Sequence, residues 1–467
     1  MTGHAWGREQ AMSPLETIMW RAETNPSLKS SMVALEILEA APNWNDLVET
    51  HRRAVLQIPR LRQRVVEPPV SLAAPRWSAD PTFGLHRHLR RGRLPIGAGW
   101  QDLFTAVEQL ATEPFDRRRP PWEAVLYDGL PGGRAAYALK LHHASTDGLG
   151  TIQLMLALHG PADAEAVSAA DPAALTAWTA LAVDLAEKAR ATPSVVRGIG
   201  AAVQRATDAP LPSVRRTIRY TESLLRVLAP PAAPPSALLA DRSTTWRFAA
   251  LDVDLDSLRR AAKAAGGSVN DAYLAALLGG YRRYHEAQGF PVDAIPMAIP
   301  ISVRRDGDPG GGNRFASARL CGPVGVVDPA ERISAIGRAV REARAELALD
   351  HVRMLSPLLA ALPAPAIGQL AAGLASGNDL QASNVPGARD DVFLAGSRVE
   401  RLYPFAPLPG CPAMITLVSH GDTCCVGVNY DPAALTDGDL FLASLEAGFT
   451  EVLALAGAVE GSARWVR

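Results

Sequence analysis

Two kinds of hydrophobic pattern alternate along most of this chain. Alternating or continuous apolar runs, which are typical of β-strands, predict strands at Val33–Leu38, Trp122–Tyr127, Arg134–His142, Trp246–Val253, Ala298–Val303, Ala413–Ser419 and Thr423–Tyr430. Apolar residues that recur every three to four positions predict helices at Asp46–Gln57, Trp100–Thr112, Asp256–Ala265, Val269–Gln288, Pro329–Leu347 and Asp437–Leu455. Strands and helices in alternation favour an α/β or α+β fold.

The pattern weakens between Ala169 and Ser243, where Ala, Pro and Thr dominate and the breaker cluster APPAAPPS occurs. Weak helical runs remain at Trp178–Arg190 and Ser213–Leu228. We therefore predict an N-terminal half at 1–168, a helical connector at 169–243 and a C-terminal half at 244–467. The amphipathic stretch TAWTALAVDLAEKAR of the connector could rest on a membrane or a lipid droplet, but packing against the protein's own core is the preferred interpretation.

Composition narrows the class of protein. The 467 residues are 48% apolar and 20% charged, and the formal net charge of −1 argues against a global field that gathers nucleic acid. The four cysteines form no disulfide framework and no CxxC pair, which favours a reducing cytoplasm. The N-terminal residues lack a signal-peptide pattern, and no window of about 18 apolar residues predicts a membrane span. We expect a cytoplasmic protein.

The stretch KLHHASTDG, residues 140–148, combines two adjacent histidines with an Asp-Gly pair. Side chains alternate along a strand, so His142 and His143 point to opposite faces and cannot do the same job. Asp147 precedes an apolar helical run and is a candidate N-cap. A neutral imidazole is a competent base when the hydrogen bond at its other nitrogen sets its tautomer. Gly148 lets the backbone approach the site, and amides of the following helix could face developing negative charge.

Other chemistries fit this sequence less well. The chain has no GxSxG motif for a serine hydrolase, and the glycine stretch DGDPGGGNR lacks the GK[ST] ending of a P-loop. A zinc site at His142, His143 and Asp147 is disfavoured, because adjacent strand histidines point apart. The arginines at 87–93 and 117–119 could bind phosphates, but exposed, solvated side chains are the preferred interpretation.

Five blocks in order resemble the bacterial wax ester synthase/diacylglycerol acyltransferase (WS/DGAT) family of HHxxxDG acyltransferases. They are MSPLETIMW, the run FDRRRPPWEAVLYDGLPGGRAAYALKLHHASTDG, SVNDAYLAALLGGYRRY, PISVRRDGDPGGGNR and SNVPG. The resemblance covers nearly the whole length, although Glu16 stands where an aspartate is usual in the family. It implies an α/β fold of two chloramphenicol-acetyltransferase-like halves around a central tunnel, with the histidine motif at their junction.

The resemblance also implies roles for single residues. His143 would be the catalytic base and His142 its support, while Asp147 would be structural, with Arg304 as a candidate partner. The substrate-binding candidates are Gly148 and the residues of two further motifs, Asn270 with Asp271 and Ser383 with Asn384. Asn270 and Asp271 follow Ser268 and could instead cap a helix, and Ser383 and Asn384 could serve only a Val-Pro-Gly turn.

The implied reaction moves a fatty acyl group from acyl-CoA, as a substrate, to a long-chain alcohol or a diacylglycerol, as in wax ester or triacylglycerol synthesis. No metal or other cofactor is needed for it. Two alternatives stay open: a condensation-type enzyme that uses a carrier-protein-bound acyl group and a specialised alcohol or amine, and a non-catalytic lipid-binding homologue. Peripheral contact with the inner membrane face or lipid droplets fits an apolar product. The sequence leaves the oligomeric state open.

Overall fold

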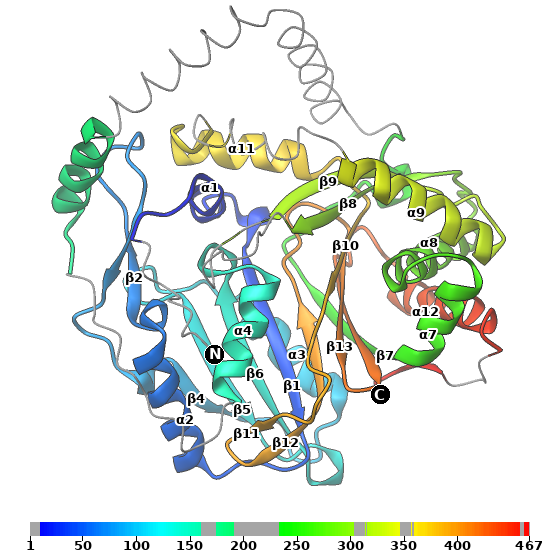
Figure 1. The fold of residues 1–467 in the computed structure, drawn as a ribbon, viewed down its shortest axis with the longest axis horizontal. Helices are drawn as coiled ribbons and strands as arrows, with labels where there is room; N and C mark the ends of the chain where they lie inside the picture. The colour runs from blue at the N-terminus through cyan, green and yellow to red at the C-terminus, as the bar shows by residue number, and fades with distance from the viewer. Residues whose placement is uncertain are drawn as a thin grey trace, which may run out of the picture.

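Two large β-sheets organise the chain in the computed structural model, and they lie side by side (Figure 1). The structure describes residues 10–159, 174–190, 233–302, 313, 315–345, 356, 359–457 and 462–466. In these ranges one sheet has the strand order β11-β12-β1-β6-β5-β4 and the other β15-β7-β14-β13-β10-β8-β9. A small hairpin of β2 (Gln63–Val66) and β3 (Arg76–Ala79) lies beside them.

The N-terminal sheet is covered on both faces. Its strands from this half are β1 (Ser31–Leu38), β4 (Leu89–Gly92), β5 (Trp122–Tyr127) and β6 (Ala135–His142). The helices of this half are α1 (Pro14–Ala22), α2 (Trp44–Gln57), α3 (Trp100–Thr112) and α4 (Gly148–Leu158). Apolar residues of α2 and α4 pack with one side of β1, including Ala34 and Leu38, whereas α3 packs with Val33 and Leu35 on the other side. Because both faces are buried, β1 and β6 are apolar almost without interruption.

The C-terminal sheet carries its helices on one face (Figure 1). The strands are β7 (Arg247–Asp254), β8 (Ile295–Ser302), β9 (Phe315–Gly322), β10 (Leu380–Val385), β13 (Ala413–His420), β14 (Thr423–Tyr430) and β15 (Ala463–Trp465). The helices on this face are α7 (Leu255–Ala264), α8 (Val269–Ala287), α9 (Pro329–Ala345) and α12 (Gly438–Ala454). Helix α11 (Ala364–Ala375) lies apart from them and packs against α1, with Ile367 in one apolar cluster with Ala22 (Figure 1). At the contact of α8 with α12, a Cβ on Gly448 would lie 2.3 Å from the Ala276 carbonyl oxygen, so glycine permits this close approach.

One segment of the C-terminal half belongs to the sheet of the N-terminal half. Strands β11 (Phe393–Leu394) and β12 (Ser397–Phe405) follow β10 in the sequence, but β12 pairs antiparallel with β1 in the other sheet. The predicted C-terminal half at 244–467 therefore contains residues 393–405 that belong to the N-terminal sheet. The division at 168 and 243 otherwise stays a prediction, because much of the predicted connector lies outside the described residues.

The described part of the connector contains a helix over 177–190, as predicted, whereas the predicted helix at Ser213–Leu228 lies outside the described residues. The helix contacts the β2–β3 hairpin through polar side chains: Glu187 pairs with Arg76, and Lys188 donates to the Leu72 carbonyl oxygen. Trp178 and Leu185 remain 71% and 57% exposed. Ala180 of the same helix is 0% exposed, so the helix packs on the protein through that side, and packing of its apolar stripe on the protein's own core stays a prediction.

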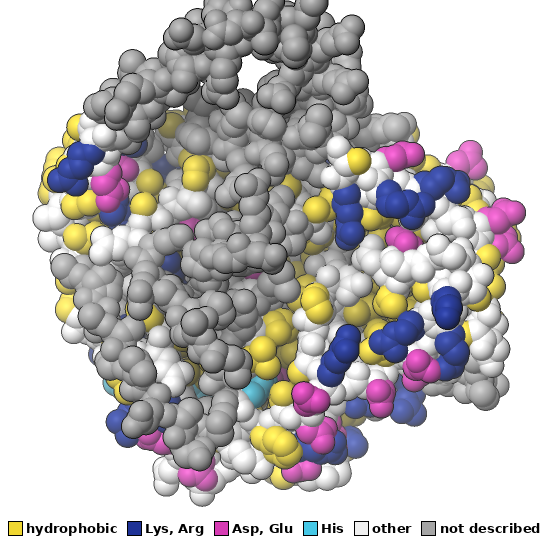
Figure 2. Space-filling view, viewed as in Figure 1, with side chains coloured by type: hydrophobic (Ala, Val, Ile, Leu, Met, Phe, Trp, Pro, Cys, Tyr) yellow, Lys and Arg dark blue, Asp and Glu magenta, His cyan; other side chains and the backbone are white. Residues whose placement is uncertain are grey.

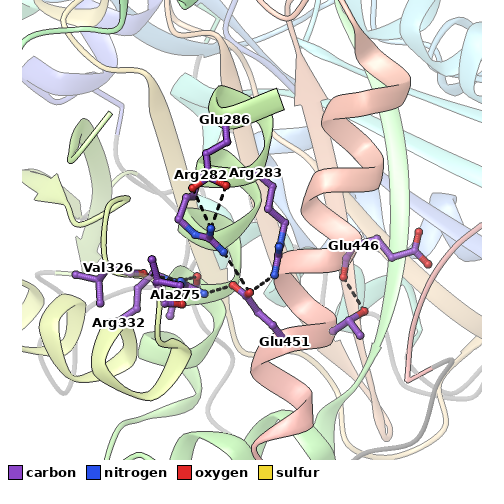
Figure 3. A network of polar contacts seen from close by, with 10 residues as sticks. Ala275, Arg282, Arg283, Glu286, Val326, Arg332, Glu446 and Glu451 are labelled. Atoms are coloured by element: carbon purple, nitrogen blue, oxygen red, sulfur yellow. Dashed lines mark hydrogen bonds and ion pairs between the residues drawn. The ribbon is translucent and has the colours of Figure 1, made fainter. Parts of the chain in front are cut away.

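A buried arginine ties the helices of the C-terminal half together (Figure 3). Arg332 on α9 is fully buried; it donates to the carbonyl oxygens of Ala275 and Val326 and pairs with Glu451 on α12. Glu451 also pairs with Arg283 on α8. Every charge in this network has an opposite neighbour, which is the condition for burying charged groups. On the described surface of this half, basic and acidic side chains are interspersed (Figure 2), which agrees with the near-zero net charge.

Candidate active site

The histidine motif lies where the two halves meet. Strand β6 ends at His142, a short turn of 3-10 helix covers residues 143–145, and α4 begins at Gly148. His143 contacts both halves: its amide donates to the Ser30 carbonyl oxygen next to β1 (2.7 Å), and its ring lies 5.6 Å from that of Phe315 on β9. The junction predicted from the sequence resemblance is therefore where the structure places the motif.

His142 is fully buried, and its two ring nitrogens contact protein groups. The Ala144 amide donates to Nδ1 (3.0 Å), so Nδ1 carries no proton. The proton of the neutral ring is then on Nε2, which lies 3.2 Å from the Glu23 carboxylate. The indole ring of Trp20 packs at 4.9 Å. With both nitrogens engaged, His142 cannot accept a proton from a substrate and instead supports the turn.

Glu23 was not singled out by the sequence analysis. Its carboxylate accepts from the Ser30 amide (2.8 Å) and lies 3.5 Å from the Arg117 guanidinium. Burial raises the pKa of Glu23, but His142, the Ser30 amide and Arg117 outweigh burial and hold the pKa at about 2. The carboxylate is therefore ionised at any working pH. Glu23 directly follows α1, so it links the end of this helix to His142 and, through Ser30, to His143.

His143 is half-buried, and a side chain of the C-terminal half orients its ring. Asn313 Oδ1 lies 3.0 Å from His143 Nδ1, and Asn313 Nδ2 donates to the His143 carbonyl oxygen (2.7 Å). A carbonyl oxygen can only accept, so the amide group of Asn313 facing it is NH2 and the group facing Nδ1 is the oxygen. Nδ1 is therefore protonated. In the neutral ring, Nε2 then carries the lone pair of a base.

The charge state of His143 suits a base. Burial lowers the pKa of His143, and its own backbone carbonyl, the Asp147 carboxylate and Asn313 offset this only in part. The folded protein therefore keeps the imidazole neutral below its ordinary pKa of about 6.5. A neutral ring with one defined tautomer is ready to accept a proton.

The position of Asn313 depends on α1. The backbone amide of Asn313 donates to Glu16 Oε1 (3.2 Å). Glu16 Oε2 accepts from the backbone amide of Ser13 (2.9 Å) in a capping box at the start of α1. The sequence analysis missed Asn313 as a site residue. The available signal was its place at the end of DGDPGGGNR, a stretch that was tested only as a phosphate loop and quoted as a family block.

Asp147 caps α4, as predicted from the sequence. Its Oδ1 accepts from the Gly150 amide (2.9 Å), and its own carbonyl oxygen accepts from the Thr151 amide (2.9 Å). A Cβ on Gly148 would lie 3.1 Å from a methyl carbon of Val385, so Gly148 permits the close approach of β10. Arg304, the predicted partner of Asp147, lies outside the described residues.

The remaining candidates lie on α8 and β10. Asp271 accepts from both the amide (2.9 Å) and the hydroxyl (2.8 Å) of Ser268 in a capping box, and Asn270 is half-buried in the first turn of the same helix. Ser383 and Asn384 lie in β10 rather than in a turn, where they pair with β13. Val385 shares a face of β10 with Ser383 and packs in the core of the N-terminal half, so this face points toward α4. The roles of these four residues stay predictions.

Two further features of the described residues bear on the chemistry. No group of three or more His, Cys, Asp or Glu side chains there could hold a metal ion, and no helix there is long and apolar enough to cross a membrane. Several arginines of the stretches 87–93 and 117–119 contact other protein groups: Arg117 stacks on Trp20 (4.5 Å), Arg118 and Arg119 pair with Asp116, and Arg91 lies over the Trp44 ring (4.9 Å).

A two-halved α/β fold with an H-H-x-x-x-D-G turn at the junction of its halves defines a class of enzymes, the HHxxxDG acyltransferases. Two family models place the chain within this class. The wax ester synthase/diacylglycerol acyltransferase catalytic domain matches residues 12–273, and the WS/DGAT C-terminal domain matches residues 311–452. The chain belongs to the WS/DGAT family and is an acyltransferase. The family and the enzyme class predicted from the five sequence blocks are confirmed.

Known proteins with similar sequence or structure agree. A Mycobacterium tuberculosis protein provisionally named a diacylglycerol O-acyltransferase is 38% identical over 460 residues, which cover 96% of this chain and 92% of that protein. The wax ester synthase/diacylglycerol acyltransferase from Marinobacter aquaeolei has a similar structure, with a TM-score of 0.62, 21% identity and coverage of 96% of this chain and 100% of the other. The starter condensation domain of rhizomide synthetase, solved as a mutant with C8-CoA, has a TM-score of 0.59, 13% identity and coverage of 96% and 95%. The predicted fold class is confirmed, whereas the tunnel stays a prediction.

Proposed function

We propose that this chain transfers a fatty acyl group from acyl-CoA to the hydroxyl of a long-chain alcohol or a diacylglycerol, with His143 as the general base. The observation that carries the proposal is the pair of hydrogen bonds between His143 and Asn313: Nδ1–H of His143 donates to Asn313 Oδ1, which fixes the ring proton on Nδ1 and leaves the lone pair on Nε2. The family name and the name of the mycobacterial relative support the acceptors, and the C8-CoA complex of the condensation domain supports the donor.

The reaction requires one proton shuttle and no acyl-enzyme. His143 Nε2 takes the proton from the acceptor hydroxyl while the hydroxyl oxygen forms a bond to the thioester carbonyl carbon. The carbonyl π electrons move onto its oxygen, and they return as the carbon–sulfur bond breaks. The departing thiolate takes the proton back from His143, which regenerates the neutral base. An ester and coenzyme A are the products, and no oxidant, metal or other cofactor enters the balance.

The protein's contribution is orientation and the exclusion of water. Glu23 and His142 fix the turn from the N-terminal half, and Asn313 fixes the ring from the C-terminal half. Such positioning lowers the entropy cost of bringing two substrates and a base together. The backbone amides at the start of α4 and the Asn270 side chain are the candidates for stabilising the oxyanion.

The exposed apolar face of helix 177–190 supports a second part of the proposal, peripheral contact with a lipid surface. Trp178 and Leu185 point outward, and the neighbouring Leu72 is 68% exposed. The charges that attach this helix are already paired, Glu187 with Arg76 and Lys188 with Asp184. An apolar patch that contains a tryptophan and has paired charges beside it suits the interface between a lipid layer and water.

The test is an assay of the purified chain with acyl-CoA and a panel of fatty alcohols, monoacylglycerols, diacylglycerols and amines, with products weighed by mass spectrometry. We expect an ester, and a loss of about 10²–10⁴-fold in kcat for His143→Gln. His88→Gln, a buried histidine of the same half outside the site, is the matched control. Full activity in His143→Gln would refute the base. Failure of acyl-CoA with every acceptor would favour the condensation-type alternative, which an acylated carrier protein would then reveal.

A further inference from the structure

A buried carboxylate, that of Glu36, lies under α4, outside the site described above. Glu36 is on β1 and is 0% exposed, and its Oε1 lies 2.6 Å from Nε2 of His159, which ends α4. Among the described residues no other hydrogen-bond partner of the Glu36 carboxylate is found. The surrounding layer is the apolar core between β1, α2 and α4, with Ala34, Leu38 and Leu158 among its members. A lone carboxylate is costly in such a place, so its pairing with His159 needs an explanation.

The other titratable groups around the pair are committed elsewhere. Tyr137 faces Glu36 from β6, but its hydroxyl lies 2.6 Å from His51 Nε2 on α2. Other neighbouring polar groups are the ion pair (2.9 Å) of Arg134, which directly precedes β6, with Glu400 on β12, and His420, which bonds the Val399 carbonyl oxygen (2.8 Å). His159 is therefore the cation for Glu36 among the described residues. Its place at the carboxyl end of α4 also favours a positive charge, because the helix dipole is negative there.

The pair is the second of two attachments between the motif segment and β1. At one end of β1, the Ser30 carbonyl oxygen holds the His143 amide. Six residues further along, about 20 Å at the rise of a strand, Glu36 holds His159. The helix between them, α4, has 11 residues, about 16 Å, so it covers most of this distance, and the turn before it covers the rest. A rigid helix held at both ends transmits the position of one end to the other.

We propose that Glu36 and His159 are positioning residues for the catalytic turn, and that the ion pair holds α4, Asp147 and His143 in register with β1 only while His159 is protonated. This inference rests on the proposed role of His143 as the base. Neither residue of the pair touches the reacting atoms. The pair acts through α4.

The consequence is a pH window with two different limits. Burial lowers the pKa of His159, but the Glu36 carboxylate outweighs burial and raises the pKa above its ordinary value of 6.5. Stability from a raised histidine pKa is fully present below the unfolded pKa and is lost as the pH rises through the folded pKa. The pair therefore sets an alkaline limit above pH 6.5. The lowered pKa of His143 sets an acid limit below it.

The experiment compares wild type, His159→Leu and the double variant Glu36→Leu/His159→Leu. His159→Leu leaves Glu36 buried without its cation, whereas the double variant replaces a buried ion pair by apolar side chains, a change that is often tolerated. We expect kcat of His159→Leu at pH 7.5 to fall about 10-fold with KM within about twofold, and the double variant to recover to within about threefold. The double variant should lose the alkaline limit and keep the acid limit. His285→Gln, a buried histidine of the other half, is the matched control and should keep both limits.

Two results would overturn the inference: a His159→Leu variant that folds and keeps the wild-type kcat at pH 7.5, or a double variant that keeps the alkaline limit. Hydrogen exchange at the backbone amides 154–158 gives a readout that needs no catalysis and applies even if His159→Leu does not fold. After correction for intrinsic rates, we expect protection of α4 in wild type to fall at least 10-fold from pH 7 to pH 9.5 and to stay constant in the double variant. Equal pH dependence in both proteins counts against the pair. Absence of acyl transfer with this exchange pattern intact counts against the proposed function alone.

Discussion

Asp379 offers a test of the electrostatics in the C-terminal half. Its side chain is 0% exposed; Oδ2 accepts from the Ser236 amide (2.8 Å), and Oδ1 has no hydrogen-bond partner among the described residues. Burial raises the pKa of Asp379 from 3.8 to about 6, although the Ser236 amide and Arg242 act in the opposite direction. The folded protein thus binds a proton more tightly at this position than the unfolded chain does.

The cost of this carboxylate follows from the two pKa values. Stability from the protonated form is present at low pH and is lost as the pH rises through about 6, so at pH 8 the ionised group costs about 3 kcal/mol. About half of this cost is already present at pH 5, because the unfolded group is largely ionised there. In Asp379→Asn the amide oxygen can still accept from Ser236, and the ionisation is gone. We expect the stability of the variant relative to wild type to rise by about 1.5 kcal/mol from pH 5 to pH 8.

The assay is scanning calorimetry at the two pH values. With an unfolding entropy of about 2.1 cal/mol/K per residue, the gain corresponds to a relative Tm shift of about 1.5 °C for this chain. The matched control is Asp431→Asn. Asp431 is also buried, but it accepts from the Ser243 amide (2.5 Å), the Ser243 hydroxyl (2.6 Å) and the Ala433 amide (2.9 Å). Its loss should destabilise by about 1–3 kcal/mol at both pH values. A constant Tm difference between Asp379→Asn and wild type would refute the reasoning.

Two other predictions concern the His143 ring and the exposed apolar side chains of the helix over 177–190. Asn313→Asp puts a carboxylate 3.0 Å from His143 Nδ1, which should raise the pKa of His143 and move the acid limit of kcat/KM upward by about one pH unit; an unmoved acid limit would contradict the orienting role. Trp178→Ser/Leu185→Ser should lower binding to phospholipid vesicles at least 10-fold in a sedimentation assay, because two large apolar side chains no longer enter the lipid. Phe290→Ser, at 54% exposure in the other half, is its control, and equal binding of both variants would locate the contact elsewhere.

Local patterns predicted many elements of this fold well. The predicted helix Trp100–Thr112 and the predicted strand Trp122–Tyr127 have the observed ends of α3 and β5. Their apolar periodicity is set by burial against one layer, and it is visible within a short window. The family blocks identified the motif and its junction position. The local pattern predicted the cap formed by Asp147, because capping involves residues that are neighbours in sequence.

Strands that leave their own half were not predicted. Strand β12 lies among C-terminal elements but pairs with β1, so its apolar face belongs to a core that the surrounding sequence does not indicate. Ser383 and Asn384 were interpreted as possible parts of a Val-Pro-Gly turn, yet they lie in β10, where they pair with β13. A central parallel strand depends on neighbours that are distant in sequence, and its short polar run carries no local signal.

The sequence by itself determined the family, the α/β architecture and the choice of His143 as the candidate base, since these depend on motifs and periodicities within short stretches. Only the tertiary structure decided the tautomer and the surroundings of this candidate base. Asn313, which sets the ring tautomer, is 170 residues from His143. Glu23, which contacts His142, lies at the end of α1, far from His142 in the sequence. Glu36 and His159 are likewise separated along the chain and meet only under α4. Hydrogen bonds of this kind depend on distances of about 3 Å and on burial, and folding alone brings both about.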